Sequence, residues 1–175
     1  MSFLTYFKQG AKIVMLDRNA MKEMAKDKKA ATYGLITLII AGLLTVALRY
    51  KEPGYAGMLM VSPIFFIICM AAITFVIQVF VRLFHGPVRH RQLFKVLSLG
   101  SIMCWLWILV TIPVLGIILK LAVLLWGVVM SIVAVEVVYN MKAKKAIPIV
   151  LIPFIIAVAV MWIVGIMIIR MYVPI

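Results

Sequence analysis

Among the polar side chains inside the apolar runs of this 175-residue sequence, two could act on a proton or a cation. They are Glu136, the one acidic residue within a long apolar run, and Gln78, near the end of another. A carboxylate surrounded by hydrocarbon is costly unless it is paired or faces water. Glu136 could therefore bind a proton or a cation, or switch helix packing. The alternative, which we favour, is an ion pair at a helix end with Arg82, Lys142 or a neighbouring basic residue, because the polar Asn140 is only about one helical turn (~5.4 Å) away. By the same reasoning, Gln78 is expected to face an adjacent helix.

Basic residues that could bind an anion form two short clusters, at 82–95 and 142–145. The first contains a helix-breaking Gly86-Pro87 pair, and its cations could cradle a phosphate beside the start of an apolar span. Such clusters attract anionic lipid headgroups by about 1 kcal/mol per basic residue. Retention of positive charge on the cytoplasmic side, without any ligand, explains them equally well. The candidate residues for binding an anionic lipid or a protein partner are Arg82, His85, Arg89, Arg91, Lys95, Lys142, Lys144 and Lys145.

Motifs typical of enzymes and metal sites are missing from the sequence. It has no G-x-S-x-G, no H-E-x-x-H, no P-loop and no pair of carboxylates. The two histidines, His85 and His90, have no carboxylate or cysteine near them in the chain, which disfavours a metal site. Cys69 and Cys104 both lie in apolar runs and are interpreted as small packing residues. We therefore expect no catalytic residue, no metal and no cofactor.

The composition is that of an integral membrane protein. Hydrophobic residues make up 67% of the chain and charged residues 13%, whereas soluble domains have roughly 45–50% and about 25%. The apolar residues come in runs of about 20, the length that crosses a hydrocarbon core of about 30 Å. The sequence predicts an all-α protein with a segment 1–29 ahead of one transmembrane domain, 30–175, whose five helices span about 30–48, 56–81, 94–112, 115–139 and 147–170.

The distribution of positive charge predicts the orientation of these spans. Segments 1–29, 82–95 and 142–145 hold most of the 18 Lys and Arg residues, and the alternate ends hold only Arg49, Lys51, Lys120 and Arg170. Because Lys and Arg are retained on the cytoplasmic side, the N-terminus is expected inside and the C-terminus outside. The net charge of +13 would suggest nucleic acid in a soluble protein, but apolar spans separate the basic loops, so no nucleic-acid partner is expected.

The N-terminal segment is predicted to be an amphipathic helix on the cytoplasmic surface. Apolar residues recur there at spacings of three or four, with lysines between them, which suits a helix lying in the headgroup layer. Asp17 or Asn19 could cap a second short helix. Whether this segment contacts the helical bundle or the bilayer is left open by the pattern. The apolar positions are Phe3, Phe7, Ala11, Val14, Met21 and Met24.

Several features of the second half of the chain resemble the Yip1 domain family of small multi-span membrane proteins. The resemblance covers roughly residues 80–155 and depends on the order and spacing of its parts. These are the loop with Gly86 leading to Phe94, the Ile112-Pro113-x-x-Gly116 turn, Trp126, Glu136-Val137-Val138-Tyr139, and Lys145-Ala146.

The resemblance implies five spans with a cytoplasmic N-terminus. Eukaryotic members of the family are associated with Rab-type small GTPases and with vesicle traffic between the ER and the Golgi. This chain has only about 29 residues ahead of its first span and lacks the long polar region of those members, which argues against a GTPase partner. It looks more like a prokaryotic member, located in the plasma membrane.

Two functions are compatible with these features. The first is a Yip1-like protein that acts by interaction, organising the membrane or binding anionic lipids or a cytoplasmic protein through its basic loops. The alternative is a small oligomeric transporter or channel with a polar path near Glu136 and Gln78. Five short spans offer few pathway residues, so a transporter is expected to require a homodimer.

Overall fold

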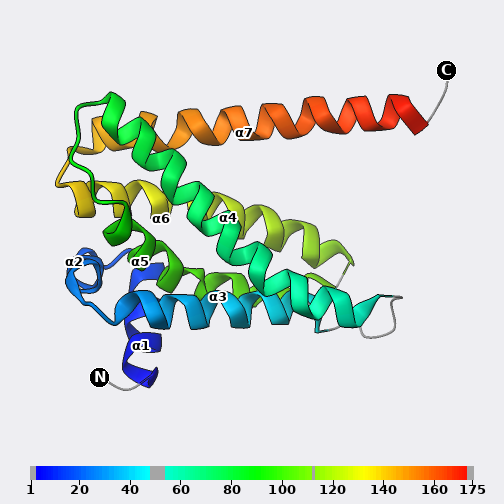
Figure 1. The fold of residues 1–175 in the computed structure, drawn as a ribbon, viewed down its shortest axis with the longest axis horizontal. Coiled ribbons are helices and arrows are strands. Elements are labelled where there is room, and N and C mark those ends of the chain that lie inside the picture. Colours follow the sequence, from blue (N-terminus) through cyan, green and yellow to red (C-terminus); the bar gives the residue numbers. More distant parts are fainter. Residues whose placement is uncertain (1–2, 48–53, 112, 173–175) are drawn as a thin grey trace.

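The computed structural model describes residues 3–47, 54–111 and 113–172, and all of its regular structure is helical. The all-α fold expected from the sequence is therefore confirmed over these residues. Figure 1 shows long helices running back and forth, with two short helices at one end. The elements are α1 (Phe3–Val14), α2 (Arg18–Lys26), α3 (Ala30–Val46), α4 (Tyr55–Leu83), α5 (His90–Gly100), the 3-10 helix η1 (Ser101–Thr111), α6 (Pro113–Tyr139) and α7 (Ala143–Tyr172).

Membrane-spanning character is clear for part of this bundle. By length and composition, Tyr55–Leu83 and Gly116–Tyr139 are each apolar enough to cross a membrane, and α2 with α3 forms a third candidate, bent by 111°. The predicted third span, 94–112, does not form one continuous α-helix. It divides into α5, which is amphipathic, and the 3-10 helix η1. The polar turn with Arg49 and Lys51 and the turn residue Ile112 lie outside the described residues.

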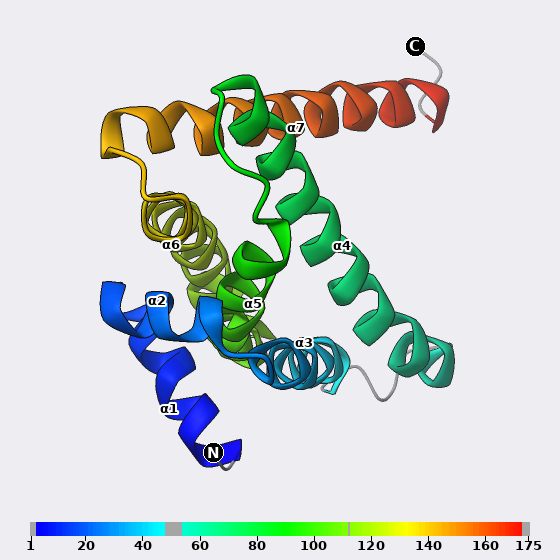
Figure 2. The ribbon, with the colours of Figure 1, turned by 60° about the vertical axis from the view of Figure 1, so that its left-hand side comes forward.

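The first two helices form one unit, which we call the N-terminal helical pair (α1 and α2). Of the two residues predicted as possible caps, Asp17 is the one that caps α2, because its Oδ1 accepts hydrogen bonds from the backbone N–H groups of Asn19 (2.8 Å) and Ala20 (3.2 Å). Figure 2 looks nearly along α3 and α6 and shows α1 and α2 together beside the start of α3. The pair contacts α3, α5, η1 and α6, so it packs on the bundle.

The face that α1 buries differs from the predicted apolar stripe. Tyr6, Gly10 and Ile13 are buried, whereas Phe3 is exposed. The reason is the close approach of α1 to the junction of α5 and η1. A Cβ atom on Gly10 would lie 2.3 Å from Ile102 Cδ1 and 2.9 Å from the carbonyl oxygen of Leu99, so only glycine lets the two backbones come this near.

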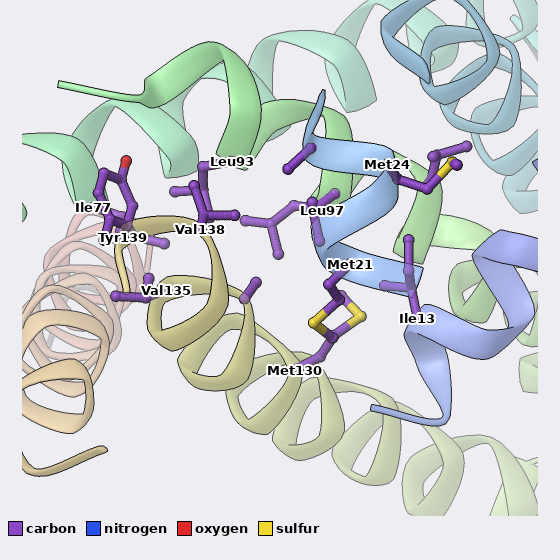
Figure 3. Packing of buried hydrophobic residues seen from close by; sticks show 14 of the residues in the cluster. Ile13, Met21, Met24, Ile77, Leu93, Leu97, Met130, Val135, Val138 and Tyr139 are labelled. Carbon is purple, nitrogen blue, oxygen red and sulfur yellow. The ribbon is translucent and has the colours of Figure 1, made fainter. Parts of the chain in front are cut away.

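Buried apolar residues concentrate at the end of the bundle where the N-terminal helical pair lies. Figure 3 shows Met21 of α2 facing Met130 of α6, and Leu97 of α5 belongs to the same cluster. Methionine fits such irregular contacts because its side chain is unbranched and flexible. Elsewhere α4, α6 and α7 expose large apolar side chains to their surroundings, as expected of helices that face lipid.

Small and hydroxyl residues fix α3 between its neighbours. A Cβ on Gly34 would lie 2.0 Å from Ser98 Oγ of α5. Beside this contact, Thr37 Oγ1 donates to the carbonyl oxygen of Ser98 at 2.7 Å, and Ser101 Oγ lies 3.4 Å from Thr37 Oγ1. Close packing at small residues and hydrogen bonds between helices are the usual means by which helices associate in lipid.

Candidate interaction surface at the basic end

The two predicted basic clusters meet at one end of the bundle. Gly86, in the loop after α4, lies so close to Met141 that a Cβ would approach its Cε to 2.4 Å. Arg89 Nη1 donates to the carbonyl oxygen of Val138 at 3.0 Å, close to the C-terminal end of α6, where a cation is favourable. Both connecting loops contain a left-handed residue, His85 (φ 59°) and Asn140 (φ 54°), and these two residue types adopt that conformation more readily than most.

Gln78 holds the first loop in place. Its Oε1 accepts hydrogen bonds from the backbone N–H of Arg89 at 3.0 Å and from the Tyr139 hydroxyl at 2.6 Å, and its Nε2 donates to the carbonyl oxygen of Pro87 at 3.4 Å. The side chain is buried, and its amide has partners on both sides. Gln78 thus positions the loop against α6, and these contacts occupy the group that a polar path would need.

Six of the predicted anion-binding residues form a surface that we call the basic tip. Their side chains are exposed and make no ion pair or hydrogen bond to any other described residue. They come from two regions of the chain. The first runs from the last turn of α4, through the loop that follows, to the first turn of α5, and the second is the loop before α7 with the first turn of α7. They are Arg82, His85, Arg91, Lys142, Lys144 and Lys145.

Two of the predicted anion-binding residues have other contacts. The guanidinium of Arg89 is bound to the carbonyl oxygen of Val138. Lys95 is half-buried, and its Nζ lies 3.4 Å from the carbonyl oxygen of Ala25 at the end of α2. Lys95 therefore faces the N-terminal helical pair, and Arg89 fastens the loop of the tip to α6.

Glu136 is paired with a residue from the far end of the sequence. Its Oε2 lies 2.6 Å from Nη2 of Arg18, the first residue of α2, in the only ion pair among the described residues. Glu136 is 8% exposed and the Arg18 side chain 63%. The sequence had suggested Arg82 or Lys142, or another basic residue nearby. The two partners are separated by 118 positions, so no local signal could have identified Arg18.

The remaining acidic side chains among the described residues also stabilise the N-terminal helical pair. Asp17 caps α2, Glu23 accepts a hydrogen bond from Gln9 Nε2 at 3.2 Å, and Asp27 accepts one from the Tyr6 hydroxyl at 2.5 Å. Trp126 of α6 adds a hydrogen bond from its Nε1 to the carbonyl oxygen of Val14 at 2.8 Å. Negative charge is therefore used to fasten α1 and α2, and none of it pairs with the basic tip in the described residues.

The contact between Tyr6 and Asp27 makes the docking of α1 sensitive to pH. The pKa of Tyr6 is raised to about 12, mainly by the hydrogen bond that its hydroxyl donates to Asp27 and, to a smaller extent, by burial. The same hydrogen bond lowers the pKa of the Asp27 carboxyl. A carboxyl with a lowered pKa stabilises docking above its unperturbed pKa of about 3.9, and this stabilisation is lost as the pH falls through the lowered value. We expect hydrogen-exchange protection of α1 to fall in that acidic range.

The Tyr6→Phe variant tests this assignment. Without the phenol, α1 should be less protected at neutral pH, and acidification should reduce its protection by a smaller amount than in the wild type. An equal decrease in both proteins would exclude the Tyr6–Asp27 bond as the source of the pH dependence. Exchange in α6 provides the internal reference.

The chemistry available at this end of the molecule is anion binding. Among the described residues, no group of three His, Cys, Asp or Glu side chains lies close enough together to hold a metal ion. The basic tip instead offers several cations on two loops that the contacts of Gln78, Gly86 and Arg89 hold together.

A family model described as the Yip1 domain matches residues 13–164. The match extends beyond the resemblance found in the sequence motifs and includes α2 with Arg18, as well as α3 and α4. No curated protein and no solved structure matches the chain.

Proposed function

The chain belongs to the Yip1 domain family, and from this premise we propose that it is a five-span membrane protein that acts by interaction through its basic tip. It binds an anionic lipid or a cytoplasmic protein there and catalyses no reaction. The observation that carries this proposal is the exposed, unpaired positive charge of the basic tip, at two connections between helices that are held in contact. The charged residues are Arg82, Arg91, Lys142, Lys144 and Lys145, and the exposed His85 lies among them.

The five crossings are α3, α4, α5 with η1, α6 and α7. Their alternating course in Figure 1 supports this, because the ends of α4 and α6 and the starts of α5 and α7 lie at one end of the bundle. The basic tip is at that end, and Lys and Arg mark the cytoplasmic side. The N-terminus is therefore cytoplasmic and the C-terminus external, in the plasma membrane of a prokaryote.

The uncompensated charge supports binding of an anionic partner. Each basic residue near an anionic surface contributes about 1 kcal/mol of attraction, so several together give a substantial affinity. The two polar residues of the alternative function, Glu136 and Gln78, have partners within the chain. Their contacts join helices and loops, which supports an interaction protein with a stable frame.

The experiment is gentle extraction from the native membrane followed by mass spectrometry of the intact particles. The wild type is expected to retain a stoichiometric anionic lipid or protein, and the quadruple variant Arg91→Gln, Lys142→Gln, Lys144→Gln, Lys145→Gln is expected to lose it. The matched control neutralises Lys8, Lys12, Lys22 and Lys26, which are exposed on α1 and α2.

The control separates a site from a general charge effect, since both variants remove four positive charges. Retention of the partner in the control and loss in the tip variant would support the proposal. Equal loss in both variants, or retention in both, would contradict it. Helix content and elution volume should match the wild type, because the four tip side chains have no partner among the described residues.

A further inference from the structure

We propose that the partner of the basic tip is an anionic phospholipid, with its phosphate at the cations of the tip and its glycerol and acyl-chain region at Leu83, Phe84 and Val88. This inference rests on the proposed function, because it names the ligand of that same surface. It is drawn from the placement of large apolar side chains among the cations.

The apolar side chains of this loop are directed to the surroundings. Leu83 is 65% exposed, Val88 59% and Phe84 38%, and they alternate along the chain with Arg82 and His85 and precede Arg91. Exposed apolar area costs about 25 cal/mol per Å² in water. A free phosphate, or a purely acidic protein surface, would satisfy the cations and leave this cost, whereas the boundary between headgroups and acyl chains satisfies both kinds of side chain.

The lengths of two helices place the tip at that boundary. The 29 residues of α4 extend about 43 Å and the 30 residues of α7 about 45 Å, at 1.5 Å per residue. A bilayer including its headgroups is about 40–45 Å thick. Leu83 ends α4 and Ala143 begins α7 at the same end of the bundle, so both helices reach the headgroup layer there (Figure 1).

Apolar exposure along α4 continues to the tip without a polar interruption on that surface. Ile68, Val76 and Val79 are all exposed, and Leu83 follows one turn after Val79. On α7, Ile147 is likewise exposed, two residues after Lys145. A lipid whose acyl chain lies along the apolar surface of α4 would therefore carry its phosphate to the height of Arg82 and Arg91.

The loop is held in one conformation before any ligand arrives. Gln78 and Arg89 fasten it to α6, and Gly86 is packed against Val81 and Met141. Because less of the loop must be ordered on binding, a preformed arrangement of cations and apolar groups binds more tightly than a flexible one. The guanidinium of Arg89 is engaged in this fastening, so Arg82, Arg91 and the lysines provide the contacts to phosphate.

The test uses the full chain in nanodiscs of phosphatidylcholine with 20% phosphatidylglycerol, released into the mass spectrometer, where retained lipids are counted. The wild type is expected to retain phosphatidylglycerol in preference to phosphatidylcholine. The charge variant, Arg82→Gln with Arg91→Gln and Lys144→Gln, should lose this preference. The apolar variant, Leu83→Ser with Val88→Ser, keeps every cation and should reduce retention at least about fivefold.

Soluble competitors separate the possible sources of the phosphate. Glycerol phosphate and inorganic phosphate carry the anion without acyl chains and are expected not to displace the retained phosphatidylglycerol at millimolar concentration. Displacement by either one, or full retention in the apolar variant, would overturn the inference. The matched control, Leu4→Ser with Met15→Ser, removes an exposed apolar residue of α1 and another in the turn that follows it, and should retain lipid as the wild type does.

The outcomes distinguish this inference from the proposed function. If the charge variant loses a co-purifying protein while phosphatidylglycerol retention is unchanged, the tip is an interaction site for a protein and the lipid assignment is wrong. If the charge variant changes neither, both proposals fail. Normal helix content and elution volume in each variant would establish that the comparison concerns folded protein.

Discussion

Replacing Arg18 with alanine is expected to release the N-terminal helical pair from the bundle. Among the described residues, the change removes the only charged partner of Glu136, which is 8% exposed and would be left buried and unpaired. Leaving a buried polar group without a partner costs about 1–3 kcal/mol, and somewhat more for a charge. Hydrogen-exchange protection of α1 and α2, measured at neutral pH by mass spectrometry, should therefore fall roughly 10- to 100-fold, at tenfold per 1.4 kcal/mol.

Replacing the other partner, Glu136, should reduce the protection of α1 and α2 by less, because the two partners of the ion pair differ in exposure. Glu136→Gln leaves Arg18 without its carboxylate, but the Arg18 side chain is 63% exposed and can be solvated by water. The control is Lys22→Ala on the same helix, where the side chain is exposed and has no partner among the described residues. If Glu136→Gln lowered the protection of the N-terminal helical pair as much as Arg18→Ala does, burial of an unpaired carboxylate would not be the source of the lost stability.

Features that depend on neighbouring residues could be predicted from the sequence. Asp17 was one of two residues proposed to cap a second short helix, and its side chain does cap α2. The basic loops and the apolar helices follow from composition and from Gly-Pro signals, because these patterns are local. The residues of the basic tip are all among those predicted to bind an anion, since basic residues between apolar runs are visible in the sequence.

Features that depend on contacts between distant segments could not be predicted in the same way. Arg18 pairs with Glu136, and the Tyr6 hydroxyl in α1 donates a hydrogen bond to Asp27 at the end of α2. The most buried face of α1 is offset from the predicted apolar stripe, of which Phe7 remains half-buried. Gly10 lies at the centre of the buried face, and a residue without a side chain contributes nothing to a hydrophobic pattern. Lys95 was grouped with Arg91, but the rotation of α5 turns it toward α2.

The α5 and η1 region shows a further limit of hydropathy. Residues 94–112 have the length and apolar content of one span, and on that basis one helix was expected. In the structure, α5 buries Leu93, Val96 and Leu97 among other helices, and η1 follows with 3-10 geometry. The helix α5 packs against α1, α2, α3, α4 and α6, and a window of mean hydropathy contains no information about such neighbours.

Gly42→Ala is expected to destabilise the bundle by about 1–3 kcal/mol, the usual cost of overpacking. A Cβ there would lie 2.6 Å from Pro63 Cα and 2.7 Å from Pro63 N, and these backbone atoms can move only if α3 and α4 separate. Separation would also weaken the hydrogen bond from Ser62 Oγ to the Gly42 carbonyl oxygen (2.9 Å).

The matched control is Gly57→Ala in α4, where a Cβ meets nothing within 4 Å. Both changes gain up to about 1 kcal/mol of helix propensity, so the difference between them isolates the steric term. Thermal unfolding in detergent, followed by circular dichroism, should show a lower midpoint for Gly42→Ala and an equal or higher one for Gly57→Ala. Equal midpoints for the two variants would contradict the close contact of α3 with α4.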